Sequence, residues 1–141
     1  MIQKKIKRPK QPKLSTLQAK ADAVTSTYIR QKYSDHAGYV KCVTCDTVLP
    51  WKDSHCAHYI ERGHIPTRYI EENLHPACPS CNVFRKEYHK RQYTLYMIDM
   101  YGRDKIDELT VESKRLLTSS QKRQIFEDAI DYYSQKLKEM A

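Results

Sequence analysis

The sequence of 141 residues contains no apolar run that approaches the ~20 residues a membrane-spanning helix requires. Met1 is followed by lysines and prolines rather than by the apolar core of a signal peptide. Internal repeats and low-complexity segments are absent beyond the first 13 residues. We therefore expect a soluble, cytoplasmic protein with no membrane partner, built as one main domain with a modest core.

Acidic residues are also in short supply. The chain has 25 Lys and Arg against 17 Asp and Glu, which gives a formal net charge of +8 and a pI of about 9.2. This excess indicates a polyanionic partner such as DNA. Residues 1–13 contain no acid, so we expect a flexible basic arm that either follows phosphates and adds salt-dependent affinity or is a solvated tail. Its basic residues are Lys4, Lys5, Lys7, Arg8, Lys10 and Lys13.

Because no export signal is expected, the cysteines predict thiolates on a metal ion rather than disulfides. Cys42 with Cys45, and Cys78 with Cys81, form two Cys-x-x-Cys pairs, which is the spacing of a four-cysteine structural Zn²⁺ site. Four thiolates complete the tetrahedron and leave no position for water, so a hydrolytic metal has to bind elsewhere. We interpret the fifth cysteine, Cys56, as a small buried apolar residue.

The segment between the two cysteine pairs carries the candidate chemistry. His58 is predicted to be a general base, because an unperturbed pKa near 6.5 suits removal of a proton from water at neutral pH. The alternative is a buried histidine with satisfied nitrogens. Asn82 is predicted to bind Mg²⁺ or Mn²⁺ through its carbonyl oxygen, or else to hydrogen-bond a helix terminus. A second ligand to this metal is expected from His55 or Asp53, and the sequence leaves that choice open.

A further amide and four basic residues complete the candidate site. Asn73 is predicted to orient His58 or to tie a loop to a strand, with an ordinary turn asparagine as the alternative. Arg62 and Arg68 lie in a loop with glycine and proline, so they are expected to return to the site and hold phosphates. The DNA-binding candidates are Arg62, Arg68, Arg85 and Lys86.

Apolar spacing predicts the surrounding elements. A helix is expected at about residues 15–32 with a capping box from Ser15 and Gln18, and a second capping box from Thr118 and Gln121 starts the final helix. Short strands are expected at residues 39–41, 47–49 and 55–60. Further helices are expected from Pro79 (with Phe84 and Tyr88 packing inward), over residues 90–101 ending at Gly102, and over residues 105–109.

The motifs together resemble those of the NinG/Rap family of phage recombination endonucleases, over about residues 23–109. They comprise Ala23-Val24, Tyr28-Ile29-Arg30, the two Cys-x-x-Cys pairs, His58-Tyr59, Arg68, Glu72-Asn73, Asn82, Tyr101-Gly102 and Ile106-Asp107-Glu108-Leu109. Three departures from the family pattern occur: His55 stands where aspartate is frequent, Ala57 stands where glycine is frequent, and a Gly-Asn pair is replaced near Glu87-Tyr88.

The resemblance implies an α+β fold with a zinc-stapled ββα-metal (HNH-like) core and flanking N- and C-terminal helices. We expect residues 14–141 to form a single HNH-like nuclease domain with an N-terminal helix (14–33), the metal core (38–90) and a helical C-terminal part (90–141). It implies cleavage of branched DNA, such as Holliday junctions and D-loops, with structural Zn²⁺ and catalytic Mg²⁺ or Mn²⁺. A homodimer is expected by analogy with junction-cutting enzymes, and the final helix with Tyr132 and Tyr133 is the expected contact surface between the two copies.

Two other functions fit part of the pattern. One is an HNH nuclease with general nicking activity, which differs only in substrate. The other is a zinc-stapled DNA-binding module without catalysis, for which the cysteine pairs and basic arm would suffice. His58 and Asn82 beside the zinc frame count against the module, because a pure binder does not need them.

Overall fold

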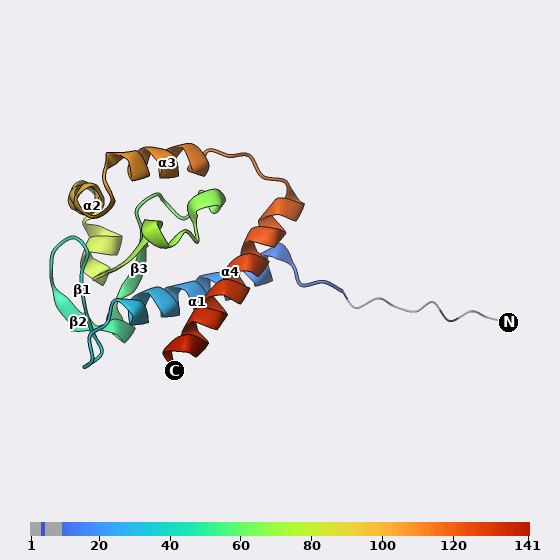
Figure 1. The fold of residues 1–141 in the computed structure, drawn as a ribbon, viewed down its shortest axis with the longest axis horizontal. Helices are drawn as coiled ribbons and strands as arrows, with labels where there is room; N and C mark the ends of the chain where they lie inside the picture. Colours follow the sequence, from blue (N-terminus) through green and yellow to red (C-terminus); the bar gives the residue numbers. More distant parts are fainter. Residues whose placement is uncertain (1–3, 5–9) are drawn as a thin grey trace.

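The computed structural model describes residue 4 and residues 10–141, so the predicted basic arm (1–13) lies largely outside the described residues. Within the described chain, helices surround two small antiparallel hairpins, which makes the fold α+β as predicted (Figure 1). No helix in the described part has the length and apolar character needed to cross a membrane.

The first helix, α1 (Leu14–Lys32), has nearly the predicted bounds. Leu17, Ala21 and Tyr28 are buried, which confirms that the apolar spacing marks its inner face. The predicted capping box at Ser15 is wrong: the helix starts one residue earlier, and Lys13 occupies the N-cap position without a side-chain hydrogen bond.

The strands form two separate hairpins. β1 (Tyr39–Lys41) pairs with β2 (Val48–Pro50), and β3 (His55–His58) pairs with β4 (Leu74–Ala77). The sequence did not predict β4, because Pro76 lacks the amide that a central strand needs. β4 pairs only with β3 in its sheet, and the Pro76 carbonyl accepts a hydrogen bond of 2.9 Å from Val43 N. That bond joins the second hairpin to the first cysteine pair.

Three 3₁₀ turns, η1 (Trp51–Asp53), η2 (Ile65–Thr67) and η3 (Glu71–Asn73), shape the connections around β3 and β4. η1 lies between β2 and β3, and η2 and η3 lie in the loop of residues 59–73 that connects β3 to β4.

The chain after the second cysteine pair differs from the prediction. Pro79 precedes a π-helix, η4 (Ser80–Phe84), and α2 (Lys86–Tyr101) begins only after Arg85, whose φ of −101° and ψ of 50° interrupt the helix. Four-residue spacing across this interruption does not place side chains on one face. Phe84 is accordingly 82% exposed, so the prediction that it packs inward is wrong.

The C-terminal helices follow their local signals. Gly102, with φ of +84°, ends α2 as predicted, since this backbone region is open to glycine. α3 (Arg103–Ser113) is longer than expected, and α4 (Ser119–Met140) begins with the predicted Thr118–Gln121 capping box. A segment arches from α3 to α4, and α4 crosses α1 (Figure 1).

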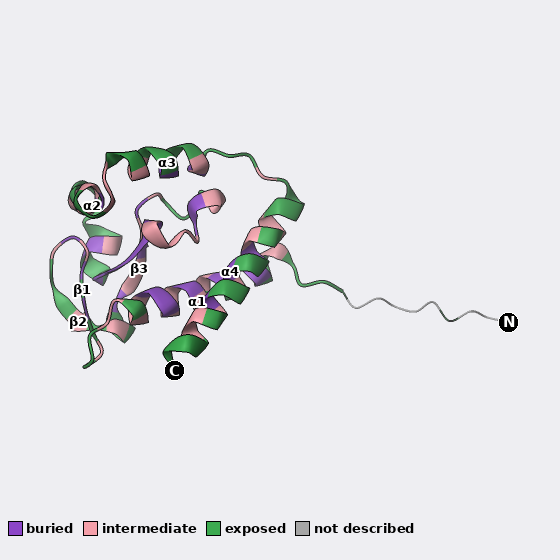
Figure 2. Ribbon diagram, in the orientation of Figure 1, coloured by how far each residue is buried: buried purple, intermediate pink, exposed green. Residues whose placement is uncertain are grey.

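Buried side chains gather in two clusters, and Figure 2 shows buried positions along α1 and the central strands. In the first cluster, α1 packs on α4 through Ile29, Phe126 and Tyr133. The second cluster lies beside the cysteines and includes Tyr93 and Met97 of α2. The β3–β4 hairpin lies between them, so its position is set by packing on both sides.

Candidate active site and metal centre

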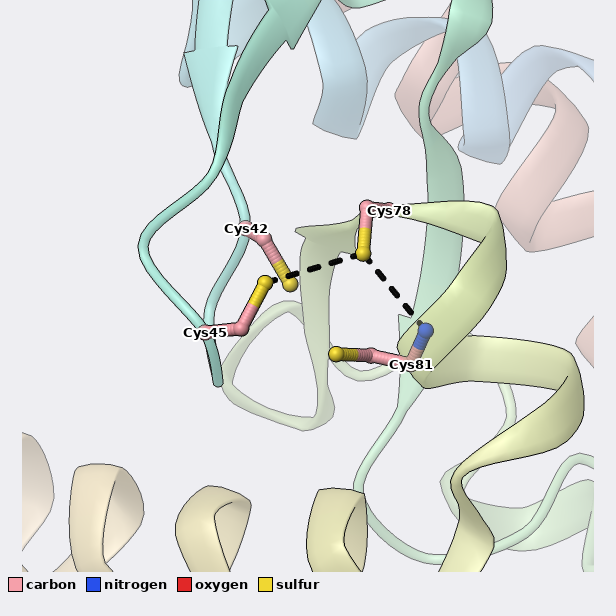
Figure 3. A group of neighbouring side chains, drawn as sticks. All are labelled: Cys42, Cys45, Cys78 and Cys81. Carbon is pink, nitrogen blue, oxygen red and sulfur yellow. Dashed lines mark hydrogen bonds between the residues drawn. The ribbon is translucent and has the colours of Figure 1, made fainter.

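The four predicted zinc cysteines converge (Figure 3). Their sulfur atoms all lie within 4.8 Å of one another, and Cys45 Sγ is 3.7 Å from Cys78 Sγ. Tetrahedral zinc with Zn–S bonds of about 2.3 Å places its sulfurs about 3.8 Å apart. The cluster therefore fits a structural Zn²⁺ ion, as the sequence predicted.

Local contacts change the pKa values of the thiols in this cluster. Burial raises the pKa of Cys81 to about 12, whereas hydrogen bonds from Thr44 and neighbouring backbone amides outweigh burial at Cys42 and lower its pKa to about 6. Thr44 Oγ1 lies 3.5 Å from Cys42 Sγ and also contacts His89 Nδ1 at 3.0 Å. Four thiolates this close repel each other, so a divalent cation is what allows all of them to ionise.

A separate cavity of about 460 Å³ lies between α1, β3 and the loop of residues 59–73. It brings together His55, His58 and Asn82, although His55 and Asn82 are 27 residues apart in the sequence. Residues three apart in a regular strand point to opposite faces, yet His55 and His58 both line the cavity; His55 is the first residue of β3. The full lining is Asp22, Thr25, Ser26, Arg30, Lys52, Ser54, His55, Cys56, His58, Arg62, Arg68, Tyr69 and Asn82.

His55 and Asn82 are in direct contact, with 3.1 Å between Nδ1 of the imidazole and Nδ2 of the amide. Rotation of the amide by half a turn puts its carbonyl oxygen at that place. Two neighbouring ligands of an octahedral ion with bonds of about 2.1 Å are about 3 Å apart, so this pair fits a hard divalent cation. Asp53 is exposed in η1 and does not line the cavity, which leaves His55 as the better-placed second ligand.

His58 is held neutral by its surroundings. Burial, followed by the positive charges of Arg68 and Arg62, lowers its pKa to about 4. The assumption of an unperturbed pKa near 6.5 is therefore wrong for this site. The imidazole enters any reaction at neutral pH in the form that accepts a proton.

Arg68 has a different environment from the one predicted for a phosphate contact. Its Nε and Nη2 donate to the two carboxylate oxygens of Asp22 at 2.9 and 2.6 Å, and its Nη1 donates to the Arg62 carbonyl at 2.6 Å. The residue is 6% exposed. Arg68 thus ties the loop to α1 and fixes the backbone of Arg62, whose own side chain is exposed at the cavity rim.

Asn73 contacts backbone rather than His58. Its Oδ1 accepts from Ile60 N at 2.7 Å, and its Nδ2 donates to the carbonyls of Ile60 and Thr67 at 3.1 Å each. These are the contacts of the second predicted role, in which the amide ties the loop to the strand. A fully buried side chain with these bonds stabilises the loop that carries Arg62 and Arg68.

Arg85 and Lys86 are exposed at the start of α2 and do not line the cavity. Their predicted contact with DNA remains a prediction. Cys56 borders the cavity and packs against the α1–α4 cluster; burial raises its pKa to about 12, so it is a neutral thiol.

Sequence reasoning missed seven lining residues, which are Asp22, Thr25, Ser26, Arg30, Lys52, Ser54 and Tyr69. Asp22, Ser26 and Arg30 recur at four-residue steps, so a polar stripe beside the apolar face of α1 was the signal that could have found them. Thr25 is 3% exposed, and its hydroxyl has no hydrogen-bond partner among the residues described. An unpaired hydroxyl at a polar cavity is a ready contact for water or a ligand.

His75 lies outside the cavity and is fully buried. Its two ring nitrogens contact Tyr93 OH at 2.6 Å and Tyr101 OH at 2.9 Å, and burial lowers its pKa to about 3. This histidine is a core residue that joins β4 to α2.

A further cavity of about 480 Å³, lined by Lys32, Glu71, Tyr101 and Tyr132 among others, contains none of the predicted site residues.

The geometry defines an α+β protein with a four-cysteine centre and, apart from it, a cationic cavity that holds two histidines and an asparagine. The model of the family described as Bacteriophage Lambda NinG protein matches residues 2–141, so the chain belongs to the NinG family. No curated protein and no solved structure shows a significant match to the chain.

Proposed function

We propose that this protein is a divalent-metal-dependent DNA endonuclease that hydrolyses phosphodiesters in branched recombination intermediates. The observation that carries the proposal is the convergence of His55, His58 and Asn82 in one cationic cavity beside the four-cysteine centre. The order β3, β4, then a helical segment with Asn82 supports a ββα-metal arrangement.

The metal fit rests on His55 and Asn82. These two residues would hold Mg²⁺ or Mn²⁺, and the ion would supply positive charge to the scissile phosphate and the leaving oxygen. Their contact is set by the frame: Asn82 follows Cys81 directly, and β3 pairs with β4, which leads into Cys78. The zinc centre therefore acts on the site by position and not by chemistry.

His58 is proposed to accept the proton from the attacking water. At neutral pH it is unprotonated, as a general base has to be, although a pKa of about 4 makes it a weak one. The cations that depress this pKa are those that bound phosphates would neutralise. DNA binding should therefore raise the basicity of His58 when substrate is present.

Three further side chains are placed to hold phosphates. Arg30, Lys52 and Arg62 line the cavity, and Arg30 is oriented by contacts to Ser26 and by its position over the Trp51 ring, 5.4 Å from the centroid. Asp22 is the only acid among the lining residues, and Arg68 neutralises it. A cavity of this charge suits a polyanion.

Branched DNA as the preferred substrate is supported by membership of the NinG family and its resemblance to recombination nucleases. A dimer remains part of the proposal, with one correction to its surface. Tyr133 is 1% exposed and packs on Tyr28 with ring centroids 5.4 Å apart, so only Tyr132, 47% exposed, is available.

The test compares cleavage of a four-way junction and a linear duplex of equal length, with Mg²⁺ and with chelator. Wild type is expected to cut the junction in a metal-dependent manner. His58→Ala should lose about 10²- to 10⁴-fold of that rate while retaining zinc and DNA binding. His64→Ala is the matched control, because His64 is exposed in the neighbouring loop and does not line the cavity.

Equal cutting of both substrates would favour a general nicking enzyme. Binding without metal-dependent cutting by the wild type would favour a zinc-stapled binding module. Undiminished cleavage by His58→Ala would remove His58 from the mechanism.

A further inference from the structure

Phe84 is a large aromatic side chain with little packing. It is 82% exposed, and its neighbour Val83 is 44% exposed. Exposed aromatic surface of this kind costs solvation free energy unless a partner covers it. Both residues belong to the π-helix that also carries Cys81 and Asn82.

The backbone around Phe84 is held firmly. Cys81 is fully buried in the four-cysteine cluster, Asn82 N donates to Cys78 O at 3.0 Å, and Arg85 N donates to Ser80 O at 3.1 Å. π-helical turns are rare and frequently occur at functional sites. The exposed Phe84 ring is therefore attached to backbone that is held in place by hydrogen bonds and by the buried Cys81.

The surroundings of Phe84 are basic. Arg85, which precedes α2, and Lys86 and Arg91 of α2 are exposed, and Glu87 is the one acid within residues 84–91. The Arg85 guanidinium is oriented by the Tyr88 ring, whose centroid lies 4.0 Å away. An exposed aromatic ring among cations is the combination that binds unstacked nucleic-acid bases, because the ring stacks on the base while the cations hold the phosphates.

We propose that Phe84 stacks on an unstacked DNA base next to the cleavage site, with Arg85 and Lys86 on the flanking phosphates. The inference rests on the proposed function and deepens it by naming the residue that selects branched DNA. Closeness in sequence to the cavity supports it, since only one residue separates Phe84 from Asn82, which lines the cavity. Bases at a branch point unstack at lower cost than bases in a continuous duplex, so an aromatic contact of this kind favours junctions.

The experiment measures binding of full-length, zinc-loaded protein to a four-way junction and to a linear duplex of equal length. It uses His58→Ala protein without divalent metal, so that binding is separated from cleavage. Phe84→Ala, added to this background, is expected to weaken junction binding about 5- to 150-fold, the range that loss of one stacked base gives, and to change duplex binding less than about 2-fold. Phe84→Trp should restore junction affinity.

Leu116→Ala is the matched control, because Leu116 is 93% exposed on the segment between α3 and α4 and should leave both affinities unchanged. Unchanged junction binding by Phe84→Ala, or an equal loss on both DNAs, would overturn the proposal. A change in sedimentation of Phe84→Ala without DNA would also overturn it, since Phe84 would then contact a second copy of the chain. The binding experiment can refute stacking by Phe84 while the wild type still cuts DNA. It can also support stacking where no cutting is detected, so the stacking proposal and the endonuclease proposal can fail independently.

Discussion

The Asp22–Arg68 pair gives a prediction whose size follows from its geometry. Asp22→Asn removes the charge that faces a guanidinium only 8% exposed, while the amide keeps nearly the same volume. Breaking a fully buried ion pair costs about 3–5 kcal/mol, because one charge is left without its partner. Since 34% of the Asp22 side chain remains exposed, we expect the free energy of unfolding to fall by a smaller amount, about 2–3 kcal/mol.

The assay is thermal and denaturant unfolding of zinc-loaded protein. With an unfolding entropy of about 2.1 cal/mol/K per residue, the 141 residues give about 0.3 kcal/mol/K, so the loss corresponds to a Tm about 7–10 °C lower. Glu112→Gln is the control: its partner Arg115 lies at 3.0 Å, but both side chains are more than 40% exposed, and such pairs contribute less than about 1 kcal/mol. If Asp22→Asn destabilised no more than Glu112→Gln, the loop would not depend on this pair, and the explanation for the placement of Arg62 would be refuted.

Two further predictions concern the metal and pH. Purified protein should contain one zinc ion per chain, and Cys78→Ser combined with Cys81→Ser should abolish cooperative unfolding; a folded double variant would contradict a structural site. His75 is neutral when folded and has a pKa lowered to about 3, so the unfolded chain binds the extra proton and stability falls as pH drops below 6.5. Between pH 7.5 and 5.5, with zinc in excess, wild type should lose about 1.4 kcal/mol more than His75→Asn; equal losses would show that His75 titrates normally.

Local signals predicted the parts of this fold whose causes are local. Gly102 and the Thr118 capping box ended and began helices as expected, and the doubled Cys-x-x-Cys spacing located the four-cysteine cluster, which could bind zinc. The same reasoning failed at Phe84, because a π-helix and the backbone of Arg85 changed the angular relation between residues four apart. It also failed at β4, where Pro76 obscured a strand that pairs on one side only.

Part of the candidate site could be predicted from the sequence, but its environment could not. His55, His58 and Asn82 were named from residue type and from position relative to the cysteines, and the structure brings them into one cavity. Asp22 and Arg68 are 46 residues apart in the sequence, so their contact could not be predicted from a local sequence pattern. The low pKa of His58 depends on that same long-range packing, so an unperturbed value was the wrong starting point.

The cavity is proposed to bind a divalent metal through His55 and Asn82, at a site distinct from the four-cysteine cluster. The most direct measurement is Mn²⁺ binding to zinc-loaded protein, followed by electron paramagnetic resonance, with no DNA present. We expect the wild type to bind one Mn²⁺ per chain. The affinity for Mn²⁺ should fall at least 10-fold in His55→Ala and in Asn82→Ala, and should not change in Asp53→Asn. Mn²⁺ binding that survives both substitutions, or no binding beyond the zinc centre in the wild type, would contradict the account.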